Sequence, residues 1–282
     1  MGVTIGAALA ALALPMAAQA FDPFLVSPDA SALDKAPAFQ HANMTAEAAL
    51  AELQSRGILV QREGSVRGVR TPVRLAGRLH GVDFHGALTE TQRATSPFEI
   101  CDARMALALD DFSVILSRHD IDEVVHYSMY RPGAPPAPVR RVRPSGVLPS
   151  MGDLPPLPAP DGSGPAAPVN PSGSSPAPQP SASAPPASRH PAGLAIDVAK
   201  LHKRSGEWLH VGAHFWGHIG ARTCGEGAVV PTDDKARELR AIVCESAAAS
   251  VFTYVLTPNY NFAHRDHFHM EIKPGARWFL IH

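Results

Sequence analysis

The chain has 282 residues, a formal net charge of −1 and a sequence pI near 6.9. Hydrophobic residues make up 45% and charged residues 18%, enough for one large domain or two small ones with a packed core. The near-neutral charge and the lack of a basic stripe give no reason to expect nucleic acid as a partner.

Residues 1–20, "MGVTIGAALAALALPMAAQA", are apolar and uncharged, and they end in Ala-Gln-Ala before Phe21. This pattern is typical of the apolar core and cleavage site of a secretory signal peptide. The missing Lys or Arg at the start leaves an uncleaved apolar anchor or a mis-assigned start codon as alternatives. We expect cleavage after Ala20, a secreted or periplasmic location, and no transmembrane segment after the signal is removed.

In chain order, residues 21–69 form an N-terminal region with one short helix over Thr45–Gly57, where Thr45 can cap the helix and Gly57 can end it. Alternating apolar and polar residues over 70–88 indicate strands and turns. Apolar residues recur at helical spacing over 100–120, which predicts a buried helix, and residues 121–131 form a strand candidate.

The composition changes abruptly over residues 132–188. These 57 residues hold 18 of the 28 prolines and no aromatic residue. Such a segment cannot bury enough apolar surface to offset its ordering entropy, so we expect a long disordered Pro-rich insertion. A linker between two domains is the alternative. Both flanking stretches, "YSMYR" and "SRHPAGLAID", carry residues of the kind found in functional sites, so we favour an insertion into one domain over residues 70–282.

Beyond the insertion, we expect a buried strand over 193–201 and a Gly- and His-rich loop over 202–222. A capped helix over 232–250 and strands over 250–258 and 266–272 follow. The pattern predicts an α+β fold, a small and mostly antiparallel sheet with packed helices. Four histidines of the loop have no clear ligand rhythm, and we expect most of them to be exposed; they are His202, His210, His214 and His218.

Three cysteines are present, Cys101, Cys224 and Cys244. An exported protein can form disulfides, but an odd number leaves at least one thiol unpaired. We favour a Cys224–Cys244 pair because these two are nearest in sequence, and we interpret Cys101 as a small core residue.

The stretch "HRDHFH", residues 264–269, contains three closely spaced histidines. On a strand, His267 and His269 point the same way and Asp266 points the other way. Two imidazoles so placed can share a metal or divide the work between ligand and base. A solvated His-rich strand edge is the alternative.

His190 and Asp197 lie seven residues apart in "SRHPAGLAID". Pro191 and Gly193 argue against a helix, and a loop-to-strand turn would bring His190 back over Asp197. In isolation, the pair is equally well interpreted as a His in a surface loop and an acidic residue at the end of a strand. Together with the later histidines, it completes two His and one carboxylate, a common ligand set for catalytic zinc with a position left for water.

"SRHPAGLAID" followed by "HRDHFH" resembles the zinc peptidases that cleave bacterial cell-wall peptides. These are the D-alanyl-D-alanine carboxypeptidases and dipeptidases and the penicillin-insensitive murein endopeptidases, which share the LAS or Hedgehog/DD-peptidase fold. The chain most resembles the extensin-like C-terminal domain, a bacterial family with "AHRDHFH" near its end. The resemblance covers residues 70–282 without the insertion. It implies a Zn²⁺ cofactor in a cleft on the sheet, with His190, Asp197 and His269 as ligands.

The resemblance also implies the catalytic residues. His267 matches a residue beside the metal that acts as base or transition-state stabiliser, and His264 completes the spacing HxxHxH. Asp266 stands where the carboxypeptidases place a Glu base. We prefer His267 as base because strand alternation turns Asp266 away from the cleft, and Asp266 remains its rival. Arg131 falls where the carboxypeptidases place an Arg that polarises substrate oxygen; a surface charge is the alternative.

The function implied is that of a monomeric, zinc-dependent peptidase acting on peptidoglycan peptides. A zinc-activated water would attack D-Ala-containing amide bonds. Two other classes stay open. One is a non-catalytic zinc domain that binds the cell wall, and the other is a structural extracellular protein whose Pro-rich segment carries the function.

Overall fold

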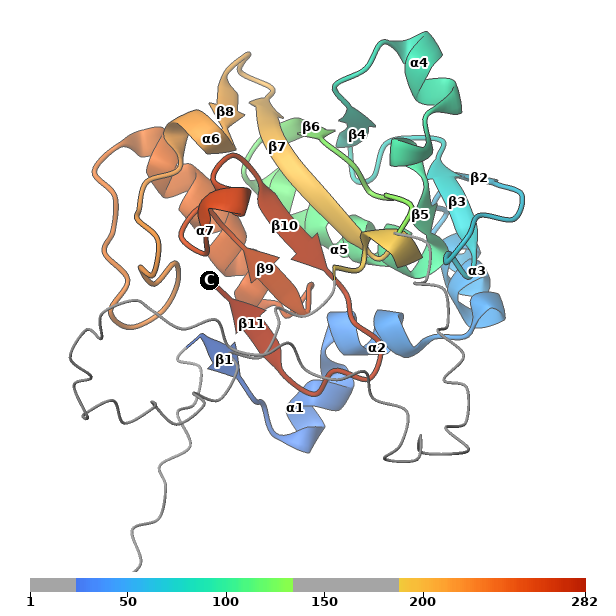
Figure 1. Ribbon diagram of the computed structural model, residues 1–282, viewed down its shortest axis with the longest axis horizontal. Coiled ribbons are helices and arrows are strands. Elements are labelled where there is room, and N and C mark those ends of the chain that lie inside the picture. The colour runs from blue at the N-terminus through green and yellow to red at the C-terminus, as the bar shows by residue number, and fades with distance from the viewer. Residues whose placement is uncertain (1–23, 134–187) are drawn as a thin grey trace, which may run out of the picture. The chain divides into compact units, whose positions relative to one another are not determined.

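The computed structural model describes residues 24–133 and 188–282, which together form one compact unit (Figure 1). The predicted signal peptide, and the Pro-rich segment apart from residues 132, 133 and 188, lie outside the described residues. Strand β6 (Ile121–His126) precedes the Pro-rich segment and pairs antiparallel with β7 (Ala195–Lys203), which follows it. The two flanks are therefore neighbours in one sheet, as an insertion into a single domain requires.

The main sheet of the described residues has eight strands in the order β1-β11-β9-β10-β7-β6-β4, with β8 paired to β7. Its remaining strands are β1 (Leu25–Val26), β4 (Asp83–Gly86), β8 (Trp208–His210), β9 (Tyr254–Leu256), β10 (Phe268–Glu271) and β11 (Phe279–Ile281). The β9–β11 and β4–β6 pairs are parallel and the others are antiparallel. The α+β class is confirmed, and the sheet is mixed and larger than expected.

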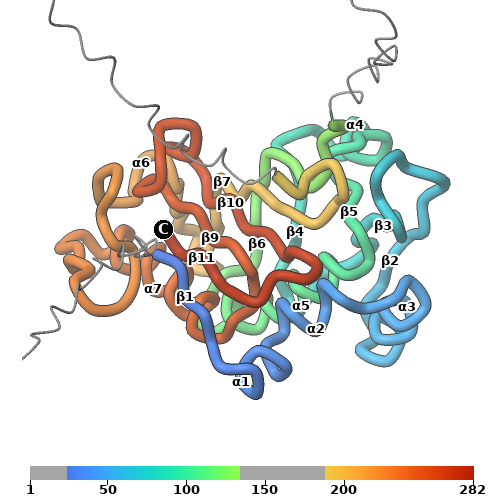
Figure 2. The backbone as a smooth tube through the Cα atoms, turned by 60° about the horizontal axis from the view of Figure 1, so that its bottom comes forward, coloured from blue at the N-terminus to red at the C-terminus, as the bar shows by residue number. Residues whose placement is uncertain are grey.

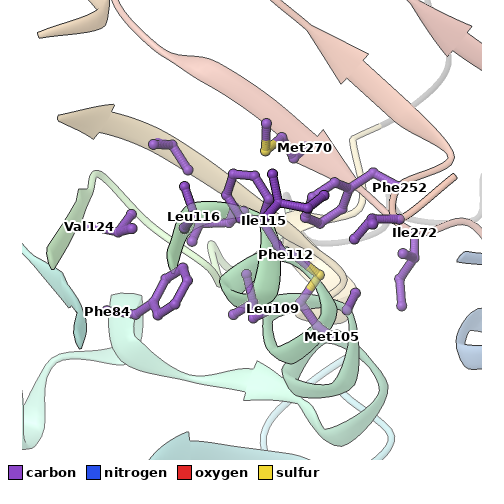
Figure 3. Close-up of a cluster of buried hydrophobic side chains, with 14 of the residues drawn as sticks. Phe84, Met105, Leu109, Phe112, Ile115, Leu116, Val124, Phe252, Met270 and Ile272 are labelled. Carbon is purple, nitrogen blue, oxygen red and sulfur yellow. The ribbon is translucent and has the colours of Figure 1, made fainter. Parts of the chain in front are cut away.

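Two long helices, α5 (Ala103–Arg118) and α7 (Asp234–Ala248), cover one face of this sheet (Figure 1). The core lies between α5 and the strands, as Figure 3 shows. Phe112 on α5 is fully buried and meets Phe252 edge to face, with ring centroids 5.4 Å apart. The helix predicted from the spacing of its apolar residues is thus confirmed.

Strand alternation separates the two faces of the sheet. Val198 on β7 and Phe268 and Met270 on β10 belong to the core under α5 and α7. Asp197 is next to Val198, and His269 lies between Phe268 and Met270. Both therefore point to the opposite face, which we call the outer face. The central strands β7 and β10 thus carry apolar side chains inward and polar side chains outward.

The N-terminal region differs from the prediction of one helix. It contains α1 (Ala30–Lys35) and α2 (Pro37–Asn43) before α3 (Ala46–Ser55), and its first strand β1 pairs with β11 (Figure 2). Helices of six and seven residues bear too little periodic pattern to be found in sequence, and the structure positions α2 against α5.

Two other predictions need adjustment. The loop expected over 202–222 contains the end of β7, strand β8 and the short helix α6 (Val211–His214). Strands β9 and β10 are shorter than expected, and β10 begins only at Phe268 because the chain turns just before it. The remaining elements are α4 (Glu90–Thr95) and a separate small sheet of β2 (Val60–Arg62), β3 (Pro72–Leu75) and β5 (Cys101–Asp102).

Cys224 and Cys244 form a disulfide, as predicted, which is compatible with a secreted protein. Cys101 is fully buried in the core, where burial and then the nearby Asp102 raise the pKa of its thiol. Of the helices in the described ranges, none has the length and apolar character needed to cross a bilayer.

Phe112→Ala should lower the free energy of unfolding by about 3–5 kcal/mol, because it leaves a cavity between α5 and the sheet. Urea unfolding with the disulfide intact measures the change. Val114→Ala is the matched control on the same helix, since Val114 is 38% exposed, and it should cost less than about 1 kcal/mol. Equal losses in the two variants would contradict the assignment of this core.

Candidate metal centre

Three predicted ligands come together on the outer face of the sheet. His190, Asp197 and His269 are buried, and their potential ligand atoms all lie within 4.8 Å of one another. Asp197 Oδ1 is 3.0 Å from His190 Nε2 and 2.9 Å from His269 Nδ1. One carboxylate oxygen is therefore shared by two imidazole nitrogens.

The local sequence explains how His190 reaches Asp197. A single turn of 3-10 helix, His190–Ala192, has Pro191 in its first turn and ends at Gly193, whose φ is 65°. A side chain at Gly193 would also come within 2.8 Å of the backbone nitrogen of Asp102. Glycine is thus required for the turn that leads into β7.

The sheet register brings in the third residue. β10 pairs antiparallel with β7, and His269 lies directly opposite Asp197. Directly opposed residues share a face and approach closely, so this pairing places the imidazole against the carboxylate. The two residues are 72 positions apart in the sequence, and the pairing of β10 with β7 brings them together.

The donor pattern fits a cation at this point. His190 Nδ1 lies 3.2 Å from the Met129 carbonyl, which can only accept a hydrogen bond. The one proton of a neutral imidazole is then used, so Nε2 turns a lone pair toward Asp197 Oδ1. Burial lowers the pKa of His190 despite the nearby Asp197, which favours the neutral ring. Nitrogen and carboxylate donors facing one another are the set that zinc takes in proteins.

His269 has a carboxylate on each side. Its Nε2 lies 3.0 Å from Glu271 Oε2, and its Nδ1 faces Asp197. Burial acts to lower its pKa, but the hydrogen bonds and charges of Asp197 and Glu271 outweigh this and raise it to about 9. The ring is therefore held as a cation between two carboxyl groups.

Glu271 is the functional residue that the sequence reasoning missed. It is buried, and its Oε2 accepts hydrogen bonds from His269 and, at 3.0 Å, from the backbone N–H of Arg189. Metal-binding histidines usually donate their second ring nitrogen to such a carboxylate. The signal was present in "HFHME", where Glu271 follows His269 by two residues and so shares its face of the strand.

The second oxygen of Asp197 faces a different group of residues. Oδ2 lies 2.7 Å from Arg131 Nη2 and 3.4 Å from the Ser128 hydroxyl. Burial acts against ionisation of Asp197, yet the hydrogen bonds and charges of its histidine neighbours hold its pKa well below its usual range. Arg131 therefore lies at the site, bound to a predicted ligand, while its side chain remains 52% exposed.

His267 and Asp266 form a pair beside the three ligands. His267 precedes β10 and does not lie on the strand as expected. Its Nε2 is nevertheless 3.5 Å from Asp197 Oδ1, and its Nδ1 is 2.9 Å from Asp266 Oδ1. Asp266 thus contacts the far side of the His267 ring and is not among the three clustered ligand residues.

His264 also lies next to this group. Its ring centroid is 5.3 Å from that of His267 and 5.7 Å from that of His269, and its Nδ1 lies 2.8 Å from Asn261 Oδ1. Burial, followed by the charges of the two neighbouring histidines, lowers its pKa to about 4. His264 is therefore neutral near pH 7.

The histidines of residues 202–222 lie elsewhere. His202 is bound to Asp122 at 2.7 Å, and His214 Nδ1 accepts a hydrogen bond from the backbone of His210 at 2.9 Å. His218 is exposed. Within the described residues, no contact of these side chains with His190, Asp197 or His269 is found.

Residues 180–280 match the family model described as Extensin-like protein C-terminus. This range contains the three clustered ligands, the HxxHxH spacing and Glu271. No curated protein and no solved structure matches the chain. The match supports the extensin-like family for the C-terminal part of the chain, and the relation to murein peptidases stays a prediction.

The purified protein should hold about one zinc ion per chain after dialysis, measured by plasma emission spectrometry. His269→Ala should lose it, because one of three ligand atoms is removed. His202→Ala is the matched control, since His202 lies on β7 but binds Asp122. A folded parent without zinc, or equal zinc in both variants, would contradict the ligand assignment.

Proposed function

We propose that this protein is a zinc-dependent peptidase that hydrolyses D-Ala-containing amide bonds of peptidoglycan peptides. The observation that carries the proposal is the convergence of His190 Nε2, Asp197 Oδ1 and His269 Nδ1, with a His–Asp pair beside them. The peptide class and its stereochemistry come from the resemblance of "SRHPAGLAID" and "HRDHFH" to cell-wall peptidases. Action on peptidoglycan also implies a secreted or periplasmic location.

His190, Asp197 and His269 would hold the metal, and Glu271 would orient His269 from behind through its Nε2. A bound zinc ion supplies Lewis acidity that activates a water and polarises a carbonyl. Burial of the three ligand side chains keeps bulk water away from their donor atoms. This strengthens the electrostatic interactions made there.

His267 is the residue placed to move a proton. Its Nδ1 is bound to Asp266, so that carboxylate fixes the ring orientation and keeps the proton on Nδ1. In the neutral ring with its proton on Nδ1, Nε2 carries a lone pair, and it points toward the ligand cluster, 3.5 Å from Asp197 Oδ1. His267 can therefore take a proton from the attacking water and return it to the leaving amine. Asp266 acts through His267 in this arrangement.

Arg131 and His264 complete the surroundings of the reacting bond. Arg131 uses one nitrogen to bind Asp197 Oδ2, and its half-exposed guanidinium keeps other N–H groups for a substrate oxygen. His264 is neutral and offers a hydrogen-bonding edge without adding charge beside His269. Together they favour the binding of a polar substrate oxygen beside the metal ligands.

His267→Ala should lower kcat on purified muropeptides by a factor of about 10²–10⁴ while zinc content stays unchanged. Asp266→Asn should cause a smaller loss, since the imidazole remains but loses its anionic partner. Liquid chromatography with mass spectrometry measures the released amino acid or peptide. His218→Ala is the control, because His218 is exposed and not part of the ligand cluster.

The same preparations separate this function from its main alternative. A parent that holds zinc, binds cell-wall sacculi and cleaves nothing, with binding unchanged by His267→Ala, would indicate a non-catalytic wall-binding domain. A loss of turnover in His267→Ala with retained zinc would exclude that alternative.

A further inference from the structure

A cavity opens on the outer face of the sheet, away from the metal ligands. Its volume is about 470 Å³, and it lies among β4, β6, β7 and β8. Apolar walls come from Leu88, Val125 and Trp208, and polar groups come from His85, Lys200 and His210. None of these residues belongs to the metal centre.

The backbone places this cavity on the same face as the ligands. In a regular strand, Asp197 and Lys200 would point to opposite faces, because they are three residues apart. The β6–β7 pairing, however, shifts register between His126 and Val125, so that His126 lies opposite Val198 and Val125 lies opposite Lys200. This bulge returns Lys200 to the outer face, and bulges often occur beside active sites.

The distance between the two places suits a short peptide. The backbone N–H of Tyr127 donates to the Asp197 carbonyl at 2.9 Å, and Val125, two residues earlier, lies opposite Lys200. Strand rises of about 3.3 Å per residue put Asp197 and Lys200 about 7–10 Å apart along the sheet. Two to three residues of an extended substrate cover that distance. Tyr127 is 48% exposed, with its ring centroid 5.7 Å from that of His267.

The positive charge of Lys200 has no partner among the described residues, since it makes no ion pair or side-chain hydrogen bond with them. Three acids near the cavity are bound to other groups. Glu123 lies 2.8 Å from His85 Nε2, and Asp122 lies 2.7 Å from His202 Nδ1. Glu207, before β8, is 3.2 Å from Lys235.

The charge of Lys200 affects the neighbouring side chain of His210. Burial first, and then the positive charge of Lys200, lower the pKa of His210. The ring centroid of Trp208 is 4.7 Å from that of His202 and 6.3 Å from that of His210. These contacts hold the indole in place as one wall of the cavity. The cavity thus combines apolar walls with one uncompensated cation.

We propose that this cavity is a substrate subsite in which Lys200 binds a free carboxylate of the peptide, two to three residues from the amide bond at the metal centre. The inference rests on the proposed peptidase function and adds an acidic peptide as its preferred substrate. An ammonium group donates up to three hydrogen bonds to a carboxylate, and apolar walls strengthen that contact by limiting water. Lys200 is then a specificity-determining residue.

Two peptides test this subsite. Both end in D-Ala–D-Ala with the scissile amide replaced by a hydrolysis-resistant ketomethylene group, and they differ only in a free or amidated carboxyl group two to three residues before it. Isothermal titration of the zinc-loaded protein gives the dissociation constants. The parent should bind the free-carboxylate peptide about tenfold more tightly. Lys200→Met should abolish this preference without weakening binding of the amidated peptide.

Lys203→Met is the matched control. Lys203 lies on the same strand and loses the same charge, but it is paired with Glu238 at 3.1 Å. This variant should keep the full preference. No preference in the parent, or a preference that survives in Lys200→Met, would overturn the subsite.

Turnover of the corresponding hydrolysable peptides and zinc content report on the peptidase separately. Cleavage of both peptides at equal kcat/KM, with no effect of Lys200→Met, would contradict the subsite and leave the peptidase proposal intact. A protein without zinc or turnover that still shows the Lys200-dependent preference sinks the peptidase proposal and keeps the carboxylate site.

Discussion

The candidate metal centre depends on one buried carboxylate. Asp197 Oδ1 meets imidazole nitrogens of His190 and His269 at 3.0 and 2.9 Å, while Oδ2 meets Arg131 at 2.7 Å. A buried anion is costly unless charges and hydrogen bonds compensate it. The turn at Gly193, the register of β7 with β10, and the end of β6 all bring a compensating group to this one residue. Loss of any one of these elements would remove one of the groups that compensate the charge.

The two faces of the sheet divide stability from chemistry. Apolar side chains from β7, β9 and β10 pack on α5 and α7, which gives a rigid base (Figure 3). Asp197 on β7 and His269 on β10 alternate with these apolar residues, so the positions of these two ligands are set by core packing that they do not themselves provide, while His190 lies on the 3-10 turn before β7. Residues on strands are held more accurately than residues on loops, which suits a ligand set needing sub-ångström placement. His267, just before β10, is held instead by its contact with Asp266.

The outer face also links the metal centre to the Lys200 cavity. The bulge in the β6–β7 pairing makes this possible, because it puts Lys200 on the side of Asp197 despite their odd spacing. Three acids near the cavity, Glu123, Asp122 and Glu207, are bound to His85, His202 and Lys235, while Lys200 has no ion-pair partner among the described residues. A chain lying across β10, β7 and β6 would meet a zinc-type ligand set at one point and a cation a few residues away. This arrangement is consistent with a peptide substrate that is read at two positions.

Residue types and local spacing determined the Cys224–Cys244 pair, the long helix α5 and the α+β class, while the ligand set was expected from two short motifs together with their resemblance to zinc peptidases. Each of these can be recognised from a local pattern, a short motif or a residue count, without knowledge of the tertiary structure. Tertiary structure alone decided that Arg131 binds Asp197, that three helices precede β2, and that Lys200 shares a face with the ligands. These features depend on strand register, on a bulge and on contacts between residues distant in sequence. Periodicity cannot report them, because the free energy that selects them comes from pairing and packing across the whole fold.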